Sequence, residues 1–217
     1  MPMTPSRRQA GFSLAELAIV LTIIALLAAG IVVGGRALIS RGEVSDLIAK
    51  IQDLTAAARD FRARYGYPPG DLPNAAAILT ADGGVSAGCS YAATGQVGNG
   101  LVDTATERRC ALEHLVKAGL IQRLDYDSAT ASYRIPLSGG ATLDLGVLAA
   151  TRQNAARITG LDCEQALELD RKLDTSPSAN APFSEGAIQA LDGAGATLTT
   201  CVPGQDNDPV PTLVVRY

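Results

Sequence analysis

The feature that most constrains this chain is an uncharged apolar run of nineteen residues near its N-terminus, Leu17–Gly35. A helix rises about 1.5 Å per residue, so a helix of this length spans roughly the hydrocarbon core of a bilayer. Arg7 and Arg8 precede the run with no acid near them, which predicts that this end stays on the cytoplasmic side. The chain beyond about Arg36 is then predicted to lie on the periplasmic side.

One carboxylate, Glu16, stands at the leading edge of the apolar run. An ionised side chain inside a membrane costs about 2.5–3.5 kcal/mol even on insertion scales, so this acid needs a reason. If the run were a secretory signal peptide cut near Gly30, Glu16 would have no function, and the apolar residues also continue past that glycine. A plain single-span anchor explains the length of the run but not the acid.

The segment Gly11-Phe12-Ser13-Leu14-Ala15-Glu16 resembles the class III signal of type IV prepilins and type II secretion pseudopilins. The resemblance implies that prepilin peptidase cuts between Gly11 and Phe12 and that Phe12 is then N-methylated. It also implies that Glu16 is the assembly acid, which pairs with the terminal amine of a neighbouring subunit. The partners implied are the peptidase, other pilin or pseudopilin subunits and the inner membrane.

The hydrophobic pattern changes after Gly35 from apolar on all sides to apolar on one side. Apolar residues recur there at three- and four-residue steps, which predicts an amphipathic helix. The stripe consists of Val44, Leu47, Ile48, Ile51, Leu54, Ala58, Phe61 and Tyr65. No proline interrupts residues 12–65, so both halves are predicted to form one helix, ended by Gly66. Gly30, Gly34, Gly35 and Gly42 are either points of bending or sites of close packing.

The remainder of the chain is predicted to form a head that contains both helices and strands. A helix is predicted within 103–121, with Asp103 or Thr104 as its cap, Glu107 placed to complete a capping box with Thr104, and Gly119 as its stop. A second helix is predicted at 162–173, with Asp162 as its cap. Strands are predicted at 132–137, 141–148, 196–202 and 211–217, with Gly139-Gly140 as a hairpin turn. The expected fold class is therefore α+β and pilin-like: a long N-terminal helix packed on an antiparallel sheet, with two short extra helices.

The resemblance and the hydrophobic pattern together predict four parts. They are a cleaved leader at residues 1–11, the transmembrane and assembly half of the helix at 12–35, its amphipathic half at 36–66, and a globular head at 67–217.

The segments 64–75 and 113–121 resemble a subgroup of Gram-negative prepilins. The helix at 162–173 with the downstream 186–188 resembles the same subgroup, which implies a short strand near 186–188. Asp71 and His114 lie in the first two of these segments, and both are expected to have structural roles. For His114 the reason is that the chain has no second histidine for a histidine-based metal site.

The four cysteines suggest two disulfides in an oxidising compartment. Three pairings are open, and we favour the local pairs, Cys89 with Cys110 and Cys163 with Cys201. Cys89 lies in a glycine-rich loop that gains most from a tether. The second pair resembles the C-terminal disulfide loop that many pilins carry.

Other chemistry is weakly supported by the sequence. Asp206 and Asp208 offer oxygen ligands that suit calcium, but they are far short of a full calcium motif, so a solvated turn is expected and no cofactor is predicted. No nucleophile set, phosphate loop or Cys-x-x-Cys motif is present, which argues against an enzyme. Without Arg7 and Arg8 the net charge is −6, so a generally DNA-coating surface is not expected.

The expected function is that of a structural subunit, major or minor, of a pilus-like or type II secretion filament. The alternative is a membrane-anchored or filament-tip module whose loop-rich head binds a surface, DNA or a secreted protein. The sequence does not separate a pilus from a secretion system.

Overall fold

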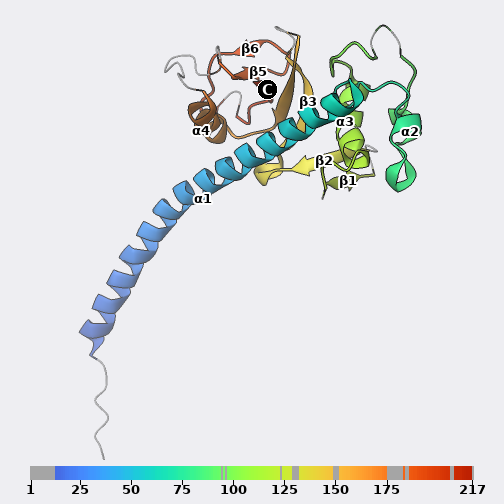
Figure 1. Cartoon of the computed structure of the whole chain (residues 1–217). Helices are drawn as coiled ribbons and strands as arrows, with labels where there is room; N and C mark the ends of the chain where they lie inside the picture. The colour runs from blue at the N-terminus through green and yellow to red at the C-terminus, as the bar shows by residue number, and fades with distance from the viewer. Residues whose placement is uncertain are drawn as a thin grey trace, which may run out of the picture. The chain divides into compact units, whose positions relative to one another are not determined.

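The computed structural model describes residues 13–93, 95, 97–122, 124–128, 132–148, 152–174, 183, 186–205 and 208–216, with side chains in these ranges except at 30–41 and 82. The chain divides into two compact units, Met1–Gly42 and Glu43–Tyr217. Helix α1, Leu14–Tyr65, contributes residues to both units (Figure 1). The long helix predicted from the sequence is thus confirmed, and each unit is described below on its own.

Within the second unit, α1 buries the apolar stripe that its spacing predicts. Val44, Leu47, Ile51, Leu54, Ala58 and Phe61 are all buried, whereas Ile48 and Tyr65 pack at the margin of the same core. Side-chain hydrogen bonds also fix this part of α1 to the head. Lys50 Nζ donates to the Pro136 carbonyl oxygen at 3.2 Å, and Gln165 Nε2 donates to Glu43 Oε2 at 2.7 Å.

The head contains a sheet in the order β1-β2-β3-β4-β7-β5-β6, and every pair of neighbours is antiparallel. The strands are β1 Asp125–Asp127, β2 Ser132–Pro136, β3 Thr142–Leu148, β4 Gln153–Thr159, β5 Ile188–Leu191, β6 Thr197–Leu198 and β7 Thr212–Arg216. Gly139 and Gly140 have φ of 71° and 83° between β2 and β3, as the predicted hairpin turn requires.

Three α-helices accompany the sheet, one more than the sequence predicted: α2 Ala75–Ile78, α3 Ala105–Lys117 and α4 Cys163–Leu173. The extra one, α2, is a single turn. The cap of α3 is the predicted capping box, because Thr104 Oγ1 accepts from Glu107 N at 3.1 Å and Glu107 Oε2 accepts from Thr104 N at 2.8 Å. The described residues also include three short 3₁₀ segments, Ala81–Gly83, Ala87–Cys89 and Ser138–Gly140.

The cap of α4 differs from the prediction. Asp162 occupies the N-cap position, but its side chain makes no capping bond. Asp208, 45 residues further along the chain, accepts a hydrogen bond from the first helical N–H, that of Cys163, at 3.0 Å. A carboxylate from a distant loop therefore takes the place of the local cap.

The sequence interpretation missed two strands. β4 lies between β3 and β7 and pairs with both, yet Ile158 is its only large apolar residue. Its buried positions Ala155 and Ala156 are too small to produce a visible alternation. Strand preference depends on neighbours across the sheet, so a strand of this composition is defined by tertiary pairing. β1, three residues long, was also missed, and β6 is shorter than the segment 196–202 predicted as a strand.

The structure joins Cys89 to Cys110 and Cys163 to Cys201, the partners expected from the sequence. The first disulfide attaches the glycine-rich loop to α3. The second attaches the start of α4 to the segment that follows β6. All four sulfurs belong to buried residues, so the two bonds lie inside the head rather than on its surface.

Candidate functional site

The first unit presents an apolar helix with no covering. Every described side chain from Ser13 to Ala29 is exposed in the single chain. The large apolar side chains among them are between 49% and 89% exposed: Leu14, Leu17, Ile19, Val20, Leu21, Ile23, Ile24, Leu26 and Leu27. Apolar surface of this extent on all sides of a helix is stable only against lipid or against other apolar helices.

Glu16, the one charged residue between Ser13 and Ala29, caps its own helix. Its Oε2 accepts from the Ser13 backbone N–H at 2.9 Å, and Ser13 Oγ accepts from the Glu16 N–H at 3.2 Å. This is a capping box, which satisfies two of the free N–H groups at the helix start. The sequence interpretation missed the role of Ser13, although the spacing Ser-x-x-Glu was a usable signal.

Two predicted site residues, Gly11 and Phe12, lie outside the described residues. Across the described ranges, the structure contains no helix that is both long enough and apolar enough to count as a membrane span.

A comparison with known families finds a match at the same, N-terminal end of the chain. Residues 6–32 match the family described as the prokaryotic N-terminal methylation motif. The chain carries a prepilin-type methylation motif. The resemblance to type IV prepilins and pseudopilins drawn from the sequence is thereby confirmed for this segment, which includes Gly11, Phe12 and Glu16. No curated protein and no solved structure matches the chain.

In the second unit, Asp71 and His114 hold loops together. Asp71 is fully buried, and its carboxylate accepts from the N–H groups of Gly98 and Gly100 at 2.5 and 2.7 Å. His114 Nδ1 accepts from Gly70 N at 3.0 Å, and its Nε2 lies 2.9 Å from the Cys89 carbonyl oxygen. Burial lowers the pKa of His114, so the ring is neutral at pH 7, with Nε2 as its donor.

Of the two candidate calcium residues, Asp208 is among the described residues and Asp206 is not. The Asp208 carboxylate accepts from Cys163 N at 3.0 Å and from Gly204 N at 2.5 Å. These backbone bonds lower the pKa of Asp208. Its oxygens are therefore already used to cap α4 and to bind the Gly204 N–H.

Asp170, near the C-terminal end of α4, is a buried acid that the sequence interpretation did not single out. Neither carboxylate oxygen has a hydrogen-bond donor among the described residues. Burial, together with the nearby carboxylate of Asp174, raises its pKa from 3.8 to about 6. Both carboxylates also lie at the negative end of the helix dipole, where an anion is unfavourable.

The raised pKa predicts how stability depends on pH. The folded state holds a proton on Asp170 that the unfolded state releases, so stability is expected to fall as pH rises from about 4 to about 6. Asp170→Asn, which cannot ionise, should raise the thermal unfolding midpoint at pH 7.5 and leave it unchanged near pH 4. Circular dichroism melts across this range are the measurement, with the exposed Asp53→Asn as control. A difference between Asp170→Asn and the parent that is the same at all pH values would contradict the assignment.

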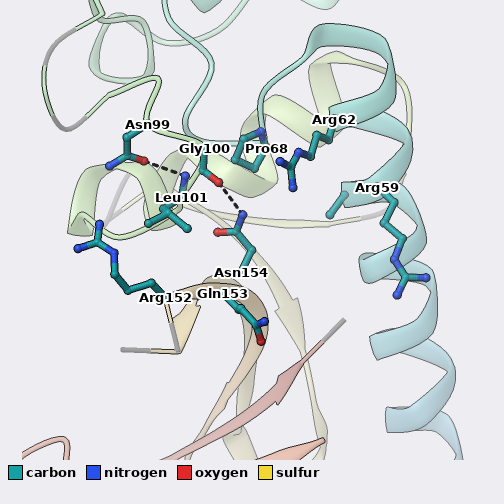
Figure 2. Close-up of a pocket in the computed structure, with 10 residues that line it drawn as sticks. Arg59, Arg62, Pro68, Asn99, Gly100, Leu101, Arg152, Gln153 and Asn154 are labelled. Carbon is teal, nitrogen blue, oxygen red and sulfur yellow. Dashed lines mark hydrogen bonds between the residues drawn. The ribbon is translucent and has the colours of Figure 1, made fainter. Parts of the chain in front are cut away.

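The head also contains a half-open pocket of about 790 Å³ (Figure 2). Its polar lining comes from three places: α1, the segment before α3, and the start of β4. These residues are Arg59, Arg62, Asn99, Arg152, Gln153 and Asn154. No local sequence pattern predicts this pocket, because Arg152 and the two α1 arginines are about 90 residues apart and only folding places them in the lining of one pocket.

Proposed function

We propose that this prepilin-type chain is a structural subunit, a pilin or pseudopilin, that polymerises through its N-terminal helix into a pilus-like or type II secretion filament. The observation that carries the proposal is the uncovered apolar helix from Ser13 to Ala29 with Glu16 as its single charge. Such a surface suits the membrane before assembly and the helices of neighbouring subunits afterwards. The methylation motif over residues 6–32 supports the same conclusion.

In this proposal the subunit is first held in the inner membrane as a single-pass precursor with its head in the periplasm. Prepilin peptidase then removes residues 1–11 and Phe12 is methylated. Glu16 is unfavourable in lipid until the amine of Phe12 on an adjacent subunit approaches it. The pairing of the two charges favours the correct register and helps the helix leave the bilayer.

The first test is the mature N-terminus. Coexpression with a prepilin peptidase should yield a chain that begins at N-methylated Phe12, measured by intact mass and N-terminal peptide sequencing. Without the peptidase, or with Gly11→Asp, the chain should keep its leader. A mature N-terminus near Gly30 or Ile31 would instead support a secretory signal peptide and contradict the proposal.

A second candidate function is a filament-tip or membrane-anchored binding module. The arginine-lined pocket in the head favours it, because a purely structural subunit has no need of a cavity of ligand size. Quantitative mass spectrometry of purified filaments separates the two functions. A main structural subunit should dominate the filament protein, whereas a tip module should be present in a few copies per filament.

A further inference from the structure

We infer that the pocket lined by Arg59, Arg62 and Arg152 is an anion-binding site that takes a small ligand bearing two or more phosphate groups. The inference concerns the head alone and does not depend on polymerisation. All ten lining residues lie between Ala58 and Asn154, within the second unit.

The charge of the lining is opposite to that of the protein. The chain as a whole has 22 acids against 18 Lys and Arg, yet the described residues that line the pocket include three arginines and no acid. Figure 2 shows Arg62 extending from α1 on one side and Arg152 from the residue before β4 on the other. The ion pair of Arg152 with Asp103 is weak, since Asp103 Oδ2 lies 3.8 Å from the Arg152 guanidinium, which is 73% exposed.

The α1 side of the pocket shows a local conflict of charge. Arg59 and Arg62 are three residues apart on one helix, where like charges repel. The negative end of the helix dipole favours cations in the last turn of α1, which accounts for Arg62 and Arg64 but not for Arg152 in the lining of the same pocket. A bound anion would offset the positive charge that Arg62 and Arg152 bring to the pocket from two different elements.

The wall opposite α1 is already held in place. Asn154 Oδ1 accepts from Val102 N and Asn154 Nδ2 donates to the Gly100 carbonyl oxygen, both at 2.9 Å (Figure 2). Gly100 N in turn donates to the buried Asp71 at 2.7 Å. The 99–102 segment is therefore fixed before any ligand arrives, so binding would spend little free energy on ordering it.

Arg152 also adopts an unfavourable backbone conformation. Its φ is +50°, in the left-handed region that few residues other than glycine and asparagine occupy. Its N–H donates to the Leu148 carbonyl oxygen at 2.8 Å, which holds this conformation. Glycine would suit the turn better, so the presence of arginine is explained by its side chain rather than by its backbone.

Phosphate is the ligand chemistry that best fits these side chains. The planar guanidinium donates in pairs to phosphate oxygens, and several arginines from different elements suit a multiply charged anion. Gln153 adds a neutral donor. The lining contains no aromatic residue on which a base could stack. The volume, about 790 Å³, falls within the range of small-molecule sites.

Isothermal titration of the full chain in neutral detergent with pyrophosphate tests the site. We expect saturable binding that weakens at least tenfold in Arg62→Ala and in Arg152→Gly. Arg152→Gly is the sharper variant, because it relieves the backbone strain and should unfold at the same or a higher temperature while losing affinity. Arg64→Ala, in the same last turn of α1 but outside the pocket, should change the affinity by less than twofold.

Two further probes identify the source of the phosphate. Tighter binding of pyrophosphate than of a thymidine hexanucleotide supports a small phosphorylated molecule, and the reverse order supports a nucleic-acid backbone as the source of the same groups. Tricarballylate that binds as tightly as pyrophosphate would overturn the choice of phosphate over carboxylate. Absence of saturable binding, or an equal loss of affinity in Arg64→Ala, would overturn the site itself.

Discussion

Glu16→Ala is expected to leave leader cleavage intact and to reduce the yield of filaments at least tenfold. Glu16 has two separable properties: it caps its own helix by accepting from Ser13 N, and it carries the one charge between Ser13 and Ala29. Loss of the cap alone costs about 0.5–2 kcal/mol of helix stability, which does not account for loss of assembly. Loss of the charge removes the group that we propose to pair with the Phe12 amine. Sheared filaments and the mature mass are the two measurements.

Two neighbouring variants separate these properties. Glutamine at the third helical position also completes a capping box, so Glu16→Gln keeps the cap and removes the charge. Ser13→Ala does the reverse. We expect Glu16→Gln to fail in assembly as Glu16→Ala does, and Ser13→Ala to form filaments. Normal filaments from Glu16→Gln would show that capping, not charge pairing, is the function of this acid.

Gly70→Ala should destabilise the head more than any surface change. Gly70 has a φ of +93°, and an added Cβ would overlap the Glu107 carbonyl oxygen and lie 3.3 Å from Ala111 Cα. Both neighbours belong to the backbone of α3, which cannot yield as a flexible side chain can. The left-handed conformation costs about 1–2 kcal/mol, and the overlap adds about 1–3 kcal/mol. Together these lower the thermal midpoint by roughly 5–15 °C for a chain of this size.

Gly66→Ala is the matched control for this variant. Gly66 ends α1 with a φ of +79°, and nothing lies within 4 Å of the Cβ it would gain. Gly66→Ala therefore has the conformational cost without the overlap, and its thermal unfolding midpoint should be only a few degrees lower than that of the parent. Equal midpoints for the two variants, measured by near-ultraviolet circular dichroism, would show that α3 moves away from position 70 at little cost.

The sequence predicted those parts of the fold that depend on local order. The stripe from Val44 to Phe61 follows the helical period, and the Thr104–Glu107 capping box follows a four-residue pattern. The Gly139-Gly140 turn follows from the φ that glycine permits. In each case the residues that decide the structure are neighbours in the sequence.

The missed features depend on residues that meet only after folding. Asp208 caps α4 from 45 residues away, and Asp71 holds Gly98 and Gly100 across a loop. β4 is a strand because β3 and β7 pair with it on both sides. The arginine pocket belongs to the same class, since no local pattern links Arg152 to Arg62. At the N-terminal end the prediction of Glu16 came from a short motif, while the cap formed by Ser13 was overlooked.

The place of β7 in the sheet affects when the head can form. It is the last of the seven strands in chain order, yet it lies between β4 and β5 and pairs with both. Until residues 212–216 take their place, both neighbours keep an unpaired edge, and such edges are open to pairing with other chains. In the topology that we propose, where the head crosses the membrane in chain order, the sheet can therefore close only after residues 212–216 have crossed. The second disulfide, whose cysteines come earlier, can form before that closure and shorten the loop that β7 must complete.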